Sequence, residues 1–160
     1  MDSDVLIPVK NITLIILFAS LWVTSLSGFA QSPERSLLLV AGHQTQPGTI
    51  PRAELRKIFL GVTVTRNGVR MKPLLNSIDS LATNVFLQQV VFMSEREYRR
   101  RLLSRVFRMG AQRPREYDDL ESLVDALRST PGSITFMWSE QFEQQSGLES
   151  LGVLWVSSSD

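Results

Sequence analysis

Hydrophobic and polar positions alternate along the chain with two different periods, and together they predict an alternation of strands and helices. The continuous apolar run over 37–41, bounded by Gly42, is typical of a buried strand, and we expect further strands over 71–75, 133–137 and 151–156. Apolar residues at helical spacing predict helices over 51–60, 81–93, 95–109 and 119–128, with a short helix or loop over 140–146. This order favours the α/β class, with a mainly parallel or mixed sheet flanked by helices.

The segment ELRKIFLG, from Glu54 to Gly61, carries the clearest helical pattern. Apolar side chains fall at i, i+3, i+4 and i+7 and line one face of a helix; they are Leu55, Ile58, Phe59 and Val62. Pro51 suits the first turn of a helix, and Gly61 suits the left-handed conformation in which many helices end. The segment therefore predicts a short helix packed against a core.

An uncharged, largely apolar stretch runs from Asn11 to Ala30, after Lys10. Small residues at its end, Gly28 and Ala30, are typical of the site at which a secretory signal peptide is cleaved. We therefore expect residues 1–30 to be a signal peptide, with an uncleaved membrane anchor as the alternative. Both place the rest of the chain in the periplasm or outside the cell, as a leader over 31–36, one α/β domain over 37–156 and a tail over 157–160.

The composition beyond residue 30 argues against several classes of function. Once Asp2, Asp4 and Lys10 are set aside, 17 basic and 16 acidic residues become 16 and 14, and a net charge of +2 does not indicate a nucleic-acid partner. The absence of cysteine excludes disulfides, thiolate catalysis and cysteine-ligated metals. The only histidine, His43, follows an expected strand and belongs to no motif typical of a catalytic triad or a zinc site. We therefore expect a binding protein with no metal and no cofactor, and not an enzyme.

Two segments, in a fixed order, resemble parts of a known family. ELRKIFLG resembles the helix reading roughly EL..IFLG in the substrate-binding proteins of phosphate ABC transporters. DLESLVDALRSTPGSITFMWS, residues 119–139, resembles the helix, Thr-Pro-Gly turn and strand of the same proteins, with Thr135-Phe136 where Gly-Tyr is usual. The resemblance extends over about residues 37–138 and implies a single lobe of a type 2 periplasmic-binding-protein-like fold.

The resemblance also implies where a ligand would bind. In this family phosphate is held by hydroxyls and backbone N–H groups at helix N-termini, which attract anions. The matching positions are Ser80 and Thr83, with Ser77 beside them, so we expect them to hold phosphate or a similar small anion for an ABC transporter. Two positions depart from the family pattern, because Leu81 stands where a glycine is usual and Asp79 adds a negative charge. The alternative is that Ser80 only caps a helix.

Arginine is concentrated between residues 96 and 115, where eight arginines accompany one acidic residue, Glu97. We expect Arg99, Arg100, Arg105 and Arg108 to form a face for an anionic partner. The alternative is the solvated face of an amphipathic helix, in which arginine stems cover apolar surface.

Two functions remain open from the sequence. The first is an exported substrate-binding-protein-like domain that binds phosphate or another small anion for an envelope transporter. The second is a protein-interaction or regulatory module of the bacterial envelope that keeps the same lobe fold without a ligand, with a transporter or signalling protein as its partner. Neither involves nucleic acid, and both involve the membrane only through residues 1–30 where that segment stays uncleaved.

Overall fold

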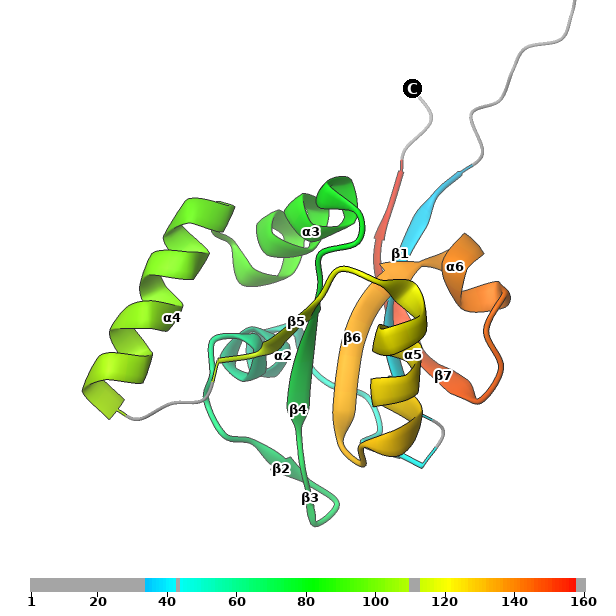
Figure 1. Cartoon of the computed structure of the whole chain (residues 1–160), viewed down its shortest axis with the longest axis horizontal. Helices are drawn as coiled ribbons and strands as arrows, with labels where there is room; N and C mark the ends of the chain where they lie inside the picture. The colour runs from blue at the N-terminus through cyan, green and yellow to red at the C-terminus, as the bar shows by residue number, and fades with distance from the viewer. Residues whose placement is uncertain (1–33, 43, 110–112, 158–160) are drawn as a thin grey trace, which may run out of the picture. The chain divides into compact units, whose positions relative to one another are not determined.

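The computed structural model has a central mixed sheet of five strands (Figure 1). From one edge to the other the strands are β5 (Arg115–Tyr117), β4 (Lys72–Asn76), β6 (Ser133–Trp138), β1 (Ser36–Gly42) and β7 (Leu148–Val156). β4 pairs in parallel with β5 and β6, whereas β1 pairs antiparallel with β6 and β7. The α/β class with a mixed sheet, expected from the sequence, is therefore confirmed.

The structure describes residues 34–42, 44–109 and 113–157. The residues from Pro33 to Asp160 form one compact unit with its own hydrophobic core. The expected signal peptide over 1–30, the first half of the expected leader, His43 and all but one residue of the expected tail lie outside the described residues. None of the helices in the described ranges is long and apolar enough to cross a membrane.

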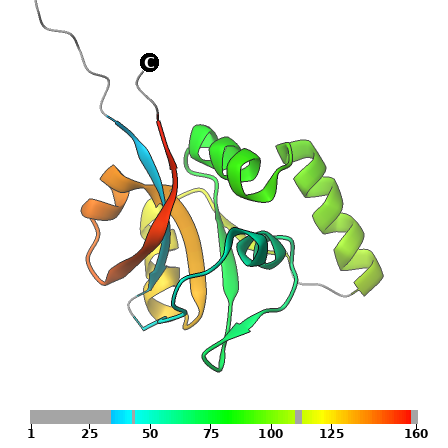
Figure 2. The same cartoon turned by 180° about the vertical axis from the view of Figure 1, so that it is seen from behind.

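Helices cover both faces of this sheet (Figures 1 and 2). One side carries α2 (Arg52–Phe59), α3 (Ser80–Phe86), the π-helical turn η2 (Leu87–Val91) and α4 (Glu95–Met109), and the other carries α5 (Leu120–Ser129) and α6 (Ser139–Glu143). Side chains of β1 alternate between two apolar clusters, since Leu37 and Leu39 join the cluster of α2 and α3, and Leu38 and Val40 join that of α5. β1 is thus buried on both faces, as its continuous apolar sequence predicts.

The helix expected from ELRKIFLG is present as α2, and it ends as the sequence predicts. Gly61 has φ +80°, and its N–H donates to Ile58 O at 3.0 Å. The N–H of Val62 donates to Lys57 O at 3.0 Å, which completes the Schellman arrangement that closes many helices on a glycine. The apolar side of α2 is buried, so its residues are explained by packing.

The sequence pattern was wrong about two elements. The helix expected over 81–93 is divided, because α3 passes into η2, which ends at Phe92 in the left-handed conformation with φ +57°. Leu87, Val90 and Val91 are all buried within the wider π-helical turn. β5 was not expected, since its sequence Arg-Glu-Tyr at the sheet edge contains no apolar run.

Glycines fix two of the turns. A short two-stranded ribbon consists of β2 (Thr65–Arg66) and β3 (Val69–Arg70), which pair across Asn67 and Gly68. These two residues have φ +48° and +78°, as a type I′ turn requires. In the Thr-Pro-Gly turn before β6, Gly132 has φ +83°, and a Cβ there would lie 2.1 Å from Arg70 O. Only glycine fits that position.

Aromatic side chains join the helices to the sheet. Phe86 of α3 stacks on Phe136 of β6 with ring centroids 4.0 Å apart, and Phe59 of α2 lies 4.6 Å from Phe86. Tyr98 of α4 is 1% exposed and donates its hydroxyl hydrogen to Phe59 O at 2.8 Å. α4 is thereby anchored to α2, and its arginine-rich outer side faces solvent.

Candidate binding site at the start of α3

The turn between β4 and α3 is where the sequence predicted an anion site. Asn76, at the end of β4, is fully buried. Its Nδ2 donates to Phe136 O at 2.9 Å, and its Oδ1 accepts from the N–H of Ile78 at 3.1 Å. The turn is therefore bonded to β6 and held in one conformation. It leads directly into the N-terminus of α3, which is the positive end of the helix dipole.

Asp79 occupies the N-cap position of α3. Its Oδ1 accepts from the N–H of Leu81 at 2.7 Å, and its Oδ2 accepts from Nε1–H of Trp138 at 2.7 Å. Trp138 is only 1% exposed, so its indole N–H requires a partner within the protein. The positive end of α3 thus meets a negative charge that the chain itself supplies.

Arg35 and Glu140 lie beside this carboxylate. The guanidinium carbon of Arg35 lies 4.2 Å from the centroid of the Trp138 ring, and its Nη2 lies 4.0 Å from Asp79 Oδ2. Its Nε donates to Glu140 Oε1 at 3.2 Å. Burial opposes ionisation of Asp79, but the hydrogen bonds from Trp138 and the backbone, together with the charge of Arg35, outweigh it and hold the pKa of Asp79 below its usual value. The carboxylate is therefore ionised at neutral pH.

The three predicted ligand residues all lie around this turn, but two of their hydroxyls are occupied. Ser77 Oγ donates to Tyr117 O at 2.9 Å and ties the turn to β5. Thr83 is 8% exposed, and its Oγ1 donates to Asn76 O at 2.7 Å. Ser80 is exposed at the first position of α3. A ligand-binding role for Ser77, Ser80 and Thr83 stays a prediction, and the bonds seen for Ser77 and Thr83 hold the turn together.

Of the four arginines predicted to form a partner face on α4, one is ion-paired with acidic residues of the described ranges and three are not. Arg99 is ion-paired with Glu95 at 2.8 Å and with Glu116 at 3.2 Å. Arg100 and Arg108 are exposed and Arg105 is half-buried. Among the residues that the structure describes, no carboxylate lies within 4.0 Å of these three guanidinium groups. Their charges are therefore not neutralised by direct ion pairs in that part of the chain.

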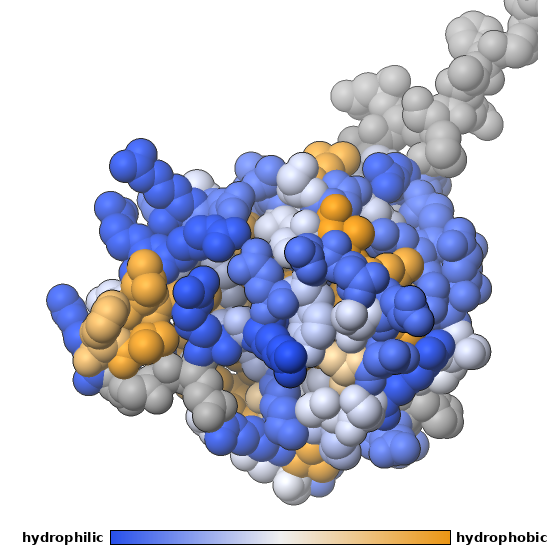
Figure 3. Space-filling view, in the orientation of Figure 1, coloured by the Kyte–Doolittle hydropathy of each residue, from blue (hydrophilic) through white to orange (hydrophobic). Residues whose placement is uncertain are grey.

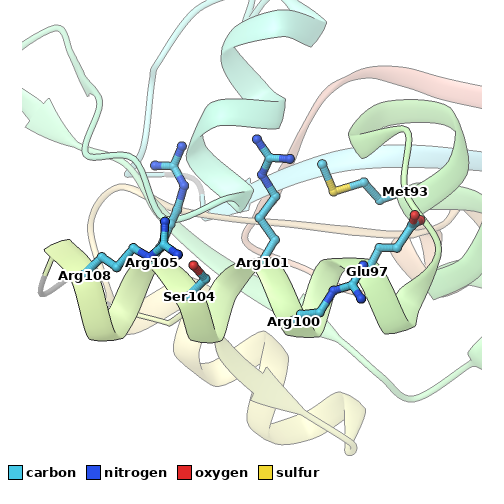
Figure 4. Close-up of a pocket in the computed structure, with 7 residues that line it drawn as sticks. All are labelled: Met93, Glu97, Arg100, Arg101, Ser104, Arg105 and Arg108. Carbon is cyan, nitrogen blue, oxygen red and sulfur yellow. The ribbon is translucent and has the colours of Figure 1, made fainter.

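A groove of about 600 Å³ runs along α4 (Figure 4). Its lining consists of Met93, Glu97, Arg100, Arg101, Ser104, Arg105 and Arg108. Figure 4 shows Arg101 and Arg105 projecting from the same side of the helix. The single acidic residue of the lining, Glu97, accepts from the N–H of Ser94 at 3.0 Å and from Ser94 Oγ at 2.8 Å, so it caps α4. The groove is therefore strongly basic.

Two apolar side chains on α4 were missed by the sequence analysis. Leu103 is 45% exposed and Phe107 is 84% exposed, one helical turn apart. Figure 3 shows apolar side chains over the lower end of α4, with hydrophilic side chains beside them. A signal for them existed, since they fall outside the helical stripe made by Tyr98 and Leu102, which are buried.

Comparison with known proteins identifies the scaffold. No protein-family model and no curated protein sequence matches the chain. An ABC-type phosphate transport receptor from Vibrio cholerae aligns with a TM-score of 0.54 at 10% identity, over 74% of this chain and 46% of the receptor. PstS from Borrelia burgdorferi aligns with a TM-score of 0.52 at 14% identity, over 74% and 47% of the two chains. The fold is that of a periplasmic-binding-protein lobe.

A third solved structure supports the same fold assignment. A possible phosphate binding protein from Planctomyces limnophilus DSM 3776 aligns with a TM-score of 0.52 at 16% identity, over 74% of this chain and 41% of that protein. The resemblance inferred from ELRKIFLG and the Thr-Pro-Gly turn is thus confirmed at the level of the fold. The chain spans less than half the length of each of the three solved proteins.

Two of the three solved proteins are described as a transport receptor and a possible binding protein, and neither description is that of an enzyme. Across residues 34–42, 44–109 and 113–157, no three His, Cys, Asp or Glu side chains are grouped so that they would hold a metal ion.

Proposed function

We propose that the lobe is an interaction or regulatory module of the bacterial envelope that keeps the binding-protein fold without its small-anion ligand. The observation that carries this proposal is the carboxylate of Asp79 at the N-cap of α3. It accepts from the N–H of Leu81, one of the groups that an anion would need at that place.

Charge repulsion acts in the same direction. A phosphate held about 4 Å from an ionised carboxylate is repelled by about 1 kcal/mol in water, and by about 4 kcal/mol at the effective dielectric constant of a protein surface. Arg35 offsets part of this repulsion, since its Nη2 lies 4.0 Å from Asp79, but the same guanidinium also bonds Glu140. Two acidic residues therefore accompany one basic residue at this end of the lobe.

The second candidate is the anion receptor that the sequence resemblance implied, with phosphate or a similar small anion held by Ser77, Ser80 and Thr83 and passed to an ABC transporter. It is supported by the names of two solved proteins that share the fold, an ABC-type phosphate transport receptor and a possible phosphate binding protein. One lobe supplies one wall of a ligand cleft, and the receptors of this class enclose their ligands by domain closure.

Isothermal titration calorimetry of residues 33–160 with inorganic phosphate at neutral pH separates the two candidates. We expect no heat of binding at millimolar phosphate for the natural sequence. Asp79→Ser keeps a capping hydroxyl and removes the negative charge, so any weak binding should appear first in this variant. Asp119→Ser at the N-cap of α5 is the matched control. Saturable binding by the natural sequence would contradict the module and favour the receptor.

Location in the periplasm or outside the cell is part of the same proposal, and it rests on the apolar stretch within residues 1–30. A transporter or signalling protein of the envelope is the kind of partner that this location allows.

A further inference from the structure

The outer side of α4 combines protruding apolar side chains with basic ones. At about 100° per residue, the helical position of Phe107 lies roughly opposite the buried Tyr98. Leu103 and Phe107 lie on this outer side together with the exposed Arg96 and Arg100, and the exposed Arg108 lies about 100° around the helix from Phe107, where it lines the groove. We call these five residues the α4 outer surface.

The α4 outer surface is held in a fixed orientation, because the opposite side of α4 is packed on the core. The hydroxyl bond from Tyr98 to Phe59 O and the burial of Leu102, which is 4% exposed, fix the inner side of α4 on the core. Burying Leu103 or Phe107 would require α4 to rotate and to expose Tyr98. An exposed apolar patch rimmed by polar groups is typical of an interaction site. Leu103 and Phe107 are both exposed one helical turn apart, and at 84% Phe107 is the most exposed large apolar side chain in the described ranges.

The charge of the outer surface is not cancelled within its own helix. α4 holds six arginines and two acidic residues. Glu95 is paired with Arg99, and Glu97 caps the helix through Ser94. The charges of Arg96, Arg100 and Arg108 therefore act on whatever approaches, with Arg101 and Arg105 along the adjoining groove adding to the field within about one Debye length.

These features fit an anionic phospholipid surface best. A second copy of the chain would bring arginines against arginines, which is repulsive. An acidic protein would need a pocket shaped for Phe107 with carboxylates around it. A lipid surface needs no such shape, because the boundary between headgroups and acyl chains accepts a protruding apolar side chain and the phosphates accept guanidinium groups.

We propose that α4 docks the lobe onto an anionic membrane surface, with Leu103 and Phe107 entering the headgroup–acyl boundary and Arg96, Arg100 and Arg108 binding lipid phosphates. This inference rests on the proposed function, since it names the partner of an interaction module. It adds a membrane contact through α4 to the one expected through residues 1–30.

Co-sedimentation of residues 33–160 with phospholipid vesicles tests the proposal. The compact unit from Pro33 to Asp160 is used so that the apolar stretch within residues 1–30 makes no contribution. Vesicles of equal parts phosphatidylglycerol and phosphatidylcholine should bind the lobe, and pure phosphatidylcholine vesicles should not. Binding should weaken strongly between about 0.1 M and about 1 M salt, over which the Debye length falls from about 10 Å to about 3 Å.

Two variants divide the apolar and basic contributions. The double change Leu103→Ser and Phe107→Ser should lower the partition coefficient at least about tenfold, from the lost burial of apolar side chains. The triple change Arg96→Gln, Arg100→Gln and Arg108→Gln should lower it about 100-fold, at about fivefold for each arginine. All five residues are partly or fully solvent-exposed, and circular dichroism should show that both variants stay folded.

A charge-matched control neutralises three basic residues away from α4, through Arg70→Gln, Lys72→Gln and Arg128→Gln, and it should bind nearly as well as the natural sequence. Absence of binding to phosphatidylglycerol vesicles at low salt would overturn the proposal, and binding of immobilised polyglutamate instead would indicate an acidic protein as the partner. Vesicle binding that is unaffected by the loss of Leu103 and Phe107 would also overturn it, since that result means nonspecific adsorption of charge.

The two proposals fail in different measurements. Heat from phosphate binding refutes the ligand-free module whether or not vesicles bind. If phosphate gives no heat of binding and the lobe does not bind vesicles, only membrane docking by α4 is refuted.

Discussion

Replacement of Asp79 should destabilise the lobe more than the loss of an ordinary helix cap. Asp79→Ala removes the N-cap of α3, which contributes about 1 kcal/mol in typical helices, with a range of about 0.5–2 kcal/mol. It also leaves Nε1–H of Trp138 without its acceptor in a side chain that is 1% exposed. An unsatisfied buried donor costs about 1–3 kcal/mol. The free energy of unfolding should therefore fall by about 2–4 kcal/mol.

Two further variants divide this loss into its parts. Asp79→Asn keeps one carbonyl oxygen, which caps α3 by accepting from the N–H of Leu81. Its other polar group is an amide N–H₂, which cannot accept the hydrogen bond from Trp138. It should lose only the part that belongs to Trp138. Asp119→Ala at the start of α5 should lose only a cap, because Asp119 accepts from the N–H groups of Glu121 and Ser122 at 3.2 and 2.8 Å and bonds no buried tryptophan.

Urea denaturation of residues 33–160, followed by circular dichroism at neutral pH, gives these differences. If Asp79→Ala destabilises the lobe no more than Asp119→Ala does, the bond from Trp138 to Asp79 contributes nothing to stability and the prediction is wrong. The pH dependence provides a second check with a fixed sign. The pKa of Asp79 is lowered in the folded state, so its contribution is present above the unfolded pKa of about 3.9 and is lost as the pH falls through the folded pKa. The stability difference between the natural sequence and Asp79→Asn should therefore shrink below about pH 4.

Other predictions address the turn, the anchor of α4 and export. Gly132→Ala should cost about 2–5 kcal/mol in urea denaturation, because a Cβ would meet Arg70 O at 2.1 Å, whereas Gly68→Ala, with a positive φ but open space, should cost only about 1–2 kcal/mol. Tyr98→Phe should lower the free energy of unfolding by about 1–3 kcal/mol, since Phe59 O loses a buried donor. Burial raises the pKa of Tyr98, with Glu116 adding to the shift, so its phenol should not ionise in an alkaline ultraviolet titration until the lobe unfolds. A fusion of residues 1–30 to alkaline phosphatase should give active enzyme outside the cytoplasm, and an inactive fusion made at a normal level would contradict export.

The elements that periodicity predicts well are those whose sequence is set by packing alone. α2 follows its apolar stripe and ends on Gly61 because both features act within a few residues of one another. β1 follows the same logic as a continuous apolar run buried on both faces, and β6 is mainly apolar and buried along its whole length. β5 escaped prediction because an edge strand of three residues takes its hydrogen bonds from β4 and needs no apolar pattern of its own.

The candidate site was predictable only in part, for a different physical reason. The position of Asp79 at a helix start follows from local sequence, because aspartate is a favoured N-cap residue. Its second bond joins it to Trp138, 59 positions later in the chain, and Arg35 comes from 44 positions earlier in the numbering. Such distant contacts are created by the sheet order, which places β4, β6 and β1 side by side. No local pattern carries that order.

The contrast between local packing patterns and distant contacts also explains why a resemblance in sequence identified the fold but not the ligand. The ELRKIFLG pattern is explained by a buried apolar helix face and by the glycine at which the helix ends. The Thr-Pro-Gly turn is explained by Gly132, where a Cβ would clash with Arg70 O. Both motifs are explained by how this lobe packs, so neither of them indicates what it binds. The proposed loss of the anion ligand rests instead on the start of α3, where the carboxylate of Asp79 accepts from the N–H of Leu81 and would repel a second negative charge. Asp79 is therefore the residue at which the two candidate functions diverge, and restoring a neutral cap there tests the divergence directly.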